Sequence, residues 1–249
     1  MGSHPASQAG TGGRGLIRRA GAKRPGETNR RVVLVAVAAA VLVQCSPAPE
    51  RSPVTSSSVT TTIQPAAIVA PVTATDLGAS WHPGCPVAPE QLRRVEVDYL
   101  GLDGQTHRGA LVVHEQLVAD VVAIFADLRR HAYPIAKMQT VDHYPGAADE
   151  LSMEDNNTSA FNCRPLPGST DWSLHAYGRA IDVNPLLNPY IDRSGDLEPT
   201  TAAQYLDRRR TDPGMLHTGD VAVRTFTDRG WTWGGNWHNP TDYQHFERR

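Results

Sequence analysis

The sequence lacks an apolar run long enough to cross a bilayer, and only 6% of its residues are aromatic and 20% charged. The run Val32–Val43 contains twelve residues without a polar side chain, whereas a membrane-spanning helix needs about 20 apolar residues. This excludes a multi-span membrane protein, and the 40% of hydrophobic residues excludes a wholly disordered chain. At 249 residues the chain can hold one sizeable domain, or a smaller one with appendages.

The charge of the chain is unevenly distributed. The formal net charge is −2, from 24 Lys and Arg against 26 Asp and Glu. Residues 1–31 hold seven of the basic residues and one acid, so residues 32–249 keep 17 basic against 25 acidic residues, a net of −8. A protein that binds nucleic-acid phosphates is expected to carry a basic face. The acidic body therefore argues against nucleic acid as a partner.

Residues 1–45 have the pattern of an export signal. Arg30 and Arg31 come directly before Val32–Val43, as the basic flank of a secretory signal precedes its apolar region. The alternative is a buried core helix or strand, which the basic flank and the low-complexity sequence after the run disfavour. Because positive flanks stay in the cytoplasm, the rest of the chain is expected to be translocated.

Cys45 closes this segment in Leu-Val-Gln-Cys, which resembles the cleavage box of bacterial lipoproteins. In that box the Cys is lipidated and becomes the mature N-terminus. Gln44 departs from the box, which has a small residue there. Lipidation of Cys45, an uncleaved anchor and ordinary signal cleavage nearby all remain open, and the long basic leader leaves open a true start downstream of Met1.

Residues 46–75 are predicted to be a disordered spacer before a folded domain at residues 76–249. The spacer contains five Pro, five Ser and six Thr, so it cannot bury enough apolar surface to become ordered. Structureless runs of this length are rare inside compact domains. Cys85 and Cys163 are expected to form a disulfide, because an exported chain meets an oxidising compartment.

The patterns within residues 76–249 predict a single α+β domain with a central antiparallel sheet flanked by helices. Apolar and polar residues alternate at 95–99, a turn signal follows at 101–104, and an apolar run at 109–113 completes the pattern of a hairpin. Residues 114–131 carry apolar residues at helical spacing. Further strands are expected within 134–141, 179–183, 232–233 and 243–246, and a further helix at 221–229.

Three residues form a candidate metal site. Of the ten histidines, His175 and His245 stand out by their surroundings, and Asp182 follows the first of them. Two imidazoles and one carboxylate leave the fourth position of a tetrahedral zinc ion open, as in catalytic sites. Gly178 would allow a sharp turn between His175 and Asp182. On a final strand, His245 would face the site while Phe246 packs in the core.

Two segments resemble the signature of the VanY-like zinc D-alanyl-D-alanine carboxypeptidases, which are related to the L-alanyl-D-glutamate endopeptidases of phage lysins. Residues 173–182 match every fixed position of Ser-x-His-x-x-Gly-x-Ala-x-Asp. In the second segment, Gly230-Trp231 and Trp237 precede an acid placed three residues before His245-Phe246. The resemblance covers roughly residues 80–249 and implies the hedgehog/D,D-peptidase-like zinc peptidase fold.

The resemblance implies a role for each matching residue. His175, Asp182 and His245 would bind one zinc ion. Asp242 would be the general base and acid, where several relatives have Glu, and His238 is the rival base. Zinc lowers the pKa of its water to about 7, and a carboxylate that does not ligate the metal can take the proton.

The family also places an Arg ahead of the first zinc ligand, and Arg164 is the candidate here. A guanidinium suits the paired oxygens of a carboxylate, although this segment departs from the commoner Ser-x-x-Arg-x-x-x-Gln form. Further candidates for substrate binding are polar residues near these segments and aromatic residues that would line either the cleft or the core. These are Ser159, Asn162, Ser173, Tyr177 and Trp237.

The expected function is that of an exported zinc metallopeptidase that removes terminal D-Ala from peptidoglycan stem peptides. Two alternatives remain: an L-alanyl-D-glutamate endopeptidase of the same fold, and a non-catalytic module that binds cell-wall peptides. A Ser-His-Asp hydrolase is disfavoured, because no Gly-x-Ser-x-Gly elbow occurs. The chain is expected to be a monomer outside the cytoplasm, either secreted or tethered to the membrane by its N-terminal segment alone.

Overall fold

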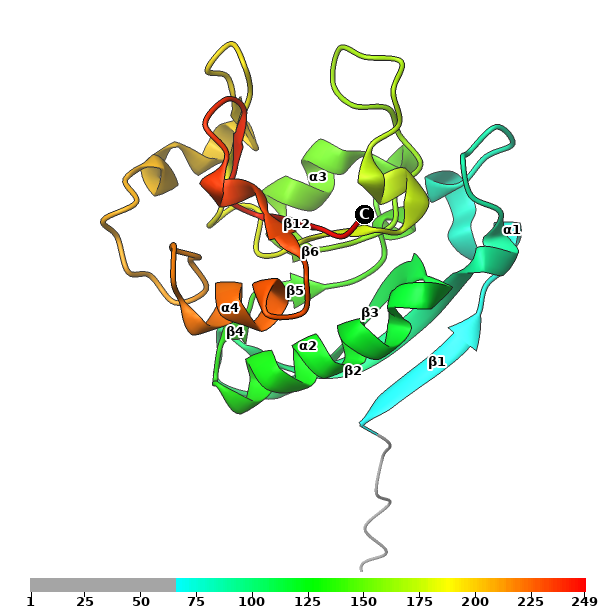
Figure 1. The fold of residues 1–249 in the computed structure, drawn as a ribbon, viewed down its shortest axis with the longest axis horizontal. Helices are drawn as coiled ribbons and strands as arrows, with labels where there is room; N and C mark the ends of the chain where they lie inside the picture. Colours follow the sequence, from blue (N-terminus) through cyan, green and yellow to red (C-terminus); the bar gives the residue numbers. More distant parts are fainter. Residues whose placement is uncertain (1–65) are drawn as a thin grey trace, which may run out of the picture. The chain divides into compact units, whose positions relative to one another are not determined.

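The computed structural model describes residues 66–249 (Figure 1). The export signal, Cys45 and the greater part of the predicted spacer lie outside the described residues. Residues 66–249 form a mixed arrangement of helices and strands, which confirms the predicted α+β class. No helix in this range is both long enough and apolar enough to span a bilayer.

The predicted hairpin is the framework of a four-stranded sheet. Strand β2 (Leu92–Gly101) pairs antiparallel with β3 (Thr106–His114). Gly104 lies in the turn between them with φ of +74°, a conformation that favours glycine. Alternate residues from Val95 to Tyr99 are buried, as in a strand that is covered on one face.

Two short strands complete this sheet along β2. Strand β1 (Ala67–Pro71) pairs antiparallel with β2, and β4 (Pro134–Ile135) pairs with it in parallel. Strand β1 and the first two residues of helix α1 (Ala74–Leu77) lie within the range 46–75 that was predicted to be disordered, so that prediction is wrong for these residues. The apolar, β-branched segment of β1 suits strand pairing, and its edge position accepts Pro71.

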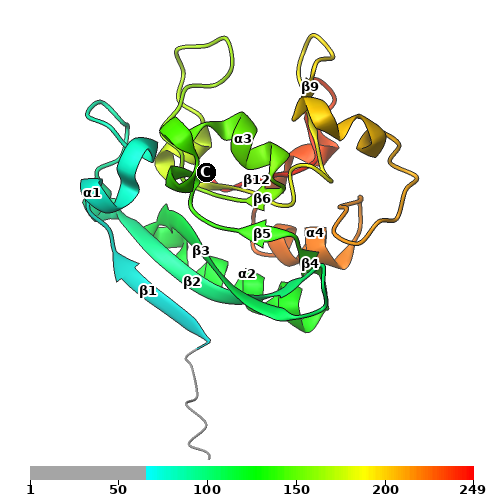
Figure 2. The same ribbon diagram turned by 180° about the vertical axis from the view of Figure 1, so that it is seen from behind.

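Helix α2 (Val118–Arg130) packs along the hairpin, and Figures 1 and 2 show it there from opposite sides. The predicted apolar stripe is confirmed, because Val121, Ile124, Phe125 and Leu128 are almost completely buried. The 3-10 turn Glu115–Leu117 comes directly before this helix, so the helix itself begins at Val118. Helix α4 (Val221–Thr227) confirms the helix predicted at 221–229, and it packs beside α2.

A second, three-stranded sheet carries two residues of the candidate site, Asp182 and His245. Its order is β10 (Thr232–Trp233), β12 (His245–Glu247), β7 (Ala180–Asp182), and every pair is antiparallel. Phe246 is fully buried and stacks on Phe226 of α4 at 3.9 Å between ring centroids. This contact fixes β12 to the core, as expected for Phe246.

The remaining elements are short, and most had no sequence signal. Strand β8 (Tyr190–Ile191) lies between β11 (Thr241–Asp242) and β9 (Leu197–Glu198) in a third sheet. Strands β5 (Lys137–Met138) and β6 (Asn157–Thr158) pair in parallel, side by side in Figure 2, and helix α3 (Asp149–Glu154) precedes β6. The predicted central antiparallel sheet is therefore incomplete as a description: the described residues form several small sheets, with parallel pairs in two of them.

Cys85 and Cys163 form the predicted disulfide, with their Cα atoms 5.9 Å apart. The bond lies beside a small apolar cluster that includes Leu77, Leu92 and Phe161. Cys163 also donates its backbone N–H to the carbonyl of Ser80 at 2.9 Å. The disulfide thus ties the first segment of the domain to the residue that directly precedes Arg164.

Candidate active site

His175, Asp182 and His245 meet in the structure at one buried point. Their ligand atoms lie within 4.8 Å of one another, and each residue is at most 6% exposed. Asp182 Oδ2 lies 3.0 Å from His175 Nε2, and Asp182 Oδ1 lies 2.9 Å from His245 Nδ1. The two imidazole nitrogens are 3.2 Å apart. The sequence-predicted triad is therefore assembled.

A tight turn places His175. The residue lies on the 3-10 segment Leu174–Tyr177, where the Ser173 hydroxyl accepts the backbone N–H of His175 at 3.3 Å. Gly178 ends the segment with φ of +65°, and a Cβ there would come within 2.6 Å of the His114 backbone nitrogen. Both facts require glycine at this position. The turn leads the chain directly into β7 and Asp182.

Strand pairing places the other two residues. In the antiparallel ladder of β7 and β12, Asp182 is the direct partner of His245. Partners of this kind have side chains on the same face, separated by about 5 Å at Cβ. On the other side of β7, Ser159 exchanges two backbone hydrogen bonds with Asp182, at 3.1 and 2.9 Å. The backbone of Asp182 is thus bonded to Ser159 on one side, while on the other side the neighbouring Val183 donates its N–H to the Gln244 carbonyl at 3.0 Å.

The outer nitrogen of each imidazole has its own partner. His175 Nδ1 lies 2.5 Å from the carbonyl oxygen of Ala160, which can only accept a hydrogen bond. That nitrogen therefore carries the proton, and Nε2 presents a lone pair to the site. His245 Nε2 faces the Glu247 carboxylate at 3.4 Å. Hydrogen bonds of this type orient histidines that bind metals.

The donor set fits a divalent metal ion such as zinc. Zn–N and Zn–O bonds of about 2.0–2.1 Å place the ligand atoms of a tetrahedral site roughly 3.3 Å apart. The two imidazole nitrogens are 3.2 Å apart, and each lies 2.9 or 3.0 Å from one of the two Asp182 carboxylate oxygens, distances close to that value. Two histidine nitrogens and a carboxylate also match the chemical preference of zinc. His175, Asp182 and His245 are the residues that could hold it.

Charge in the metal-free site is concentrated on the triad. Burial opposes ionisation of Asp182, but His175 and His245 keep its pKa far below the usual range. Burial likewise opposes protonation of His245, but its hydrogen bonds to Asp182 and Glu247 raise its pKa to about 10. The buried point therefore carries a permanent carboxylate that attracts positive charge.

Asp242 lies beside the triad with a carboxyl group that has an altered pKa. Burial raises the pKa of Asp242 to about 7, even though the attraction of His245 and Arg164 exceeds the repulsion from Asp182 and Asp149. Its Oδ1 atom is buried without a hydrogen-bond partner. An unpartnered carboxylate oxygen with a pKa near neutrality is suited to take up and release a proton.

Arg164 faces the same space from the loop after the disulfide. Its guanidinium forms an ion pair with Asp149 of α3 at 2.5 Å, and both side chains are about one-quarter exposed. Burial opposes its charge, but Asp149, Asp182 and Asp242 keep the pKa of Arg164 above its usual value. Its Nε atom is buried without a partner. The guanidinium is therefore a charged donor available to a ligand.

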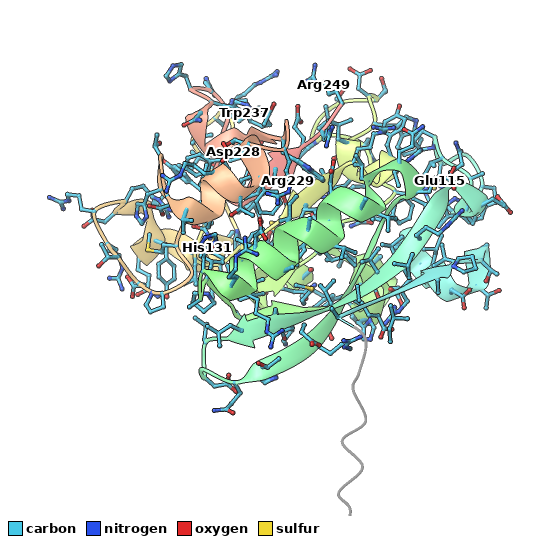
Figure 3. All side chains as sticks on the ribbon, turned by 60° about the horizontal axis from the view of Figure 1, so that its bottom comes forward. Glu115, His131, Asp228, Arg229, Trp237 and Arg249 are labelled. Carbon is cyan, nitrogen blue, oxygen red and sulfur yellow. A yellow bond between two sulfur atoms is a disulfide. The ribbon has the colours of Figure 1, made fainter. Side chains whose placement is uncertain are left out.

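These residues line a cavity of about 300 Å³. Among the predicted substrate residues, Ser173 and Trp237 lie on its wall, and the Trp237 ring is 5.6 Å from that of His245. Figure 3 shows Trp237 together with Arg249, which also lines the cavity, on the opposite side of α2 from the β1–β2 edge. The cavity opens beside the three convergent donors.

The other predicted site residues do not line this cavity. Ser159 is buried and acts through its backbone bonds to Asp182. Asn162 is buried and donates to the Ala147 carbonyl at 3.3 Å. Tyr177 is half-buried on the turn after His175, and His238, the rival base, is exposed. Position thus favours Asp242 over His238.

Several cavity residues were not foreseen from the sequence. The unforeseen residues are Asp149, Tyr190, Glu198, Gln244, Glu247 and Arg249. Glu247 had a usable signal, because it lies two positions after His245 and so on the same face of a strand. Asp149 and Glu198 lie on elements that have no periodic pattern, so their place could not be inferred.

Part of the chain matches a family of known proteins. Residues 167–248 match the family model for D-alanyl-D-alanine carboxypeptidases. The resemblance read from the sequence is thereby confirmed over a region that contains the whole triad and Asp242. None of the curated proteins and none of the solved structures gave a match. The D-alanyl-D-alanine carboxypeptidase match supports a peptidase that acts on peptidoglycan outside the cytoplasm.

Proposed function

We propose that the protein is a zinc-dependent carboxypeptidase that removes the terminal D-Ala from peptidoglycan stem peptides. The observation that carries the proposal is the convergence of three donors on one buried point beside Asp242. His175, Asp182 and His245 meet at 2.9–3.2 Å, within the region matched by the D-alanyl-D-alanine carboxypeptidase model.

His175, Asp182 and His245 would hold the zinc ion. When bound, zinc acidifies a water molecule and polarises the peptide carbonyl as a Lewis acid. The histidines serve this role through the nitrogens that face the cavity, because Ala160 and Glu247 engage the outer nitrogens. Three protein donors leave a coordination position for water or substrate, which distinguishes a catalytic from a structural site.

Asp242 is proposed as the general base and acid. Its carboxylate removes a proton from the attacking water and returns it to the amine of the departing D-Ala. A pKa of about 7 suits both steps, since the group must accept and release the proton at neutral pH. The buried Oδ1 atom of Asp242 has no hydrogen-bond partner among the described residues, so it can accept a hydrogen bond from water.

Arg164 is proposed to bind the free carboxylate at the end of the peptide. A carboxypeptidase needs a fixed positive charge beside the scissile bond, and a guanidinium can hold a carboxylate through two hydrogen bonds. Arg164 lines the same cavity as the triad, with Ser173 and Trp237 on the wall. The ion pair with Asp149 at 2.5 Å keeps the guanidinium in place.

We further propose that residues 1–45 contain the signal that exports the domain, which is then secreted or tethered to the cell membrane by this segment. The Cys85–Cys163 disulfide supports this location, because disulfides persist outside the cytoplasm. Mass analysis of a digested stem peptide tests the function itself. We expect the loss of a single alanine when zinc is supplied and no loss when a chelator is added.

A further inference from the structure

We propose that Glu247 is a positioning residue that holds His245 in the one tautomer able to bind the metal. Glu247 follows His245 by two positions on β12, so both side chains lie on the same face of the strand. Its Oε2 atom is 3.4 Å from His245 Nε2, and the residue is 9% exposed. The inference rests on the proposed metal site and goes beyond its three ligands.

The choice of tautomer at His245 is a competition between two carboxylates. Nδ1 of the ring is 2.9 Å from Asp182 Oδ1, while Nε2 faces Glu247. The ring that binds a metal is neutral and has one N–H, which either carboxylate can accept. With the proton on Nδ1, the ring would bind Asp182 and have no lone pair for the metal. With the proton on Nε2, Nδ1 is available as a ligand.

Glu247 shifts this competition toward the tautomer that binds metal. Without its carboxylate, Asp182 would be the one carboxylate among the described residues within hydrogen-bond distance of the His245 ring. The proton would then occupy the position that the metal needs. Carboxylates that accept the outer N–H of a ligating histidine orient the ring and increase its basicity.

The two histidines differ in how their outer nitrogens are held. His175 Nδ1 bonds to the backbone carbonyl of Ala160, which no side-chain substitution removes. His245 depends on a side chain, and Glu247 is itself contacted by Arg249 at 3.2 Å through its other oxygen. A substitution of Glu247 can therefore change how the His245 ring is held without removing any of the three metal ligands.

Zinc titration of the full-length chain in the presence of a competing chelator tests this inference. Glu247→Gln keeps the shape of the side chain and removes its charge, and Glu247→Leu removes the acceptor. We expect the dissociation constant for zinc to rise about 10-fold for Glu247→Gln and up to about 100-fold for Glu247→Leu, the range found when such partners are replaced. Thermal unfolding of both metal-free variants verifies that they fold.

Glu198→Gln is the matched control, because Glu198 lines the same cavity and contacts neither histidine. It makes the same change of charge and should leave zinc affinity within about twofold of the unaltered chain. In the zinc-bound protein, nuclear magnetic resonance should detect a slowly exchanging proton on His245 Nε2. That proton should exchange faster in Glu247→Gln, which a purely structural role for Glu247 would not predict.

The outcomes separate the two proposals. If the unaltered chain binds no zinc, the proposed function fails and this inference fails with it. If it binds zinc and both Glu247 variants bind equally well, only the inference is overturned. Equal weakening by Glu247→Gln and Glu198→Gln would also overturn it, because the effect would then come from charge in the cavity at large.

Discussion

Asp182 is paired directly with His245 across strands β7 and β12, and their side chains meet at 2.9 Å. A shift of this pairing by one residue would turn one side chain to the opposite face of the sheet. The register is fixed from both sides, because Phe246 stacks in the core and Ser159 bonds to the backbone of Asp182. The geometry of the candidate metal site is therefore a consequence of sheet register.

Asp242→Asn should abolish most of the activity and leave the metal in place. The amide cannot take a proton from water, and general acid–base groups contribute about 10²- to 10⁴-fold to rate. We expect kcat to fall within this range while the bound zinc remains unchanged, as measured by steady-state kinetics and elemental analysis. Asp196→Asn, an equivalent change at an exposed turn position, should have the activity of the unaltered chain. Full activity in Asp242→Asn would remove Asp242 from the mechanism.

The rate should also depend on pH through Asp242. Burial raises its pKa to about 7 in the metal-free protein, and the base acts as the carboxylate. As the pH falls through the pKa, the group becomes protonated, so kcat/KM should decrease on the acidic side. A bound cation favours the carboxylate and would move the midpoint to lower pH. A profile of kcat/KM that stays flat from pH 8 to about pH 4 would contradict this role.

Arg164→Lys should weaken binding of peptides that end in a free carboxylate. Lysine keeps the charge but loses the paired donors of the guanidinium, and hydrogen bonds to charged groups contribute about 1.5–3 kcal/mol. We expect KM to rise at least about tenfold for such a peptide. The same peptide with an amidated C-terminus is the control. The Arg164→Lys variant and the unaltered chain should cleave this amide equally slowly. An unchanged KM for the free acid would argue against Arg164 as the carboxylate-binding residue.

Replacing Cys85 and Cys163 together by Ser should destabilise the domain. The disulfide closes a loop between residues 78 positions apart, and removing a crosslink of this type costs about 2–4 kcal/mol. Denaturant unfolding should show this loss of free energy of unfolding, while the unaltered chain under reducing conditions should approach the double variant. Equal stability of the oxidised chain and the double variant would show that the bond adds nothing to the fold.

The parts of the fold that could be predicted have a periodic pattern. Residues 95–113 and the stripe Val121–Leu128 follow strand and helix spacing over several repeats, and both predictions are confirmed. The pairs β8–β9 and β8–β11 involve strands of two residues, which are too short to have any period. These strands form because other segments of the chain provide their pairing partners, and a local sequence pattern does not identify such partners.

The site shows the same division. His175, Asp182 and His245 could be proposed because the signature fixes their spacing, and the structure brings them together. Asn162 was predicted to face substrate but bonds to the Ala147 carbonyl instead, a partner that sequence alone does not identify. Glu247 could have been found from the strand period that links it to His245.

Digestion of a stem pentapeptide that ends in D-Ala-D-Ala, followed by mass analysis, tests the central claim most directly. With zinc, the unaltered chain should release one alanine and leave the rest of the peptide intact. A chelator, or the substitution His175→Ala, should stop the reaction, and added zinc should restore it only after chelation. Release of one alanine that continues in chelator and in His175→Ala, or cleavage between L-Ala and D-Glu instead, would contradict the account.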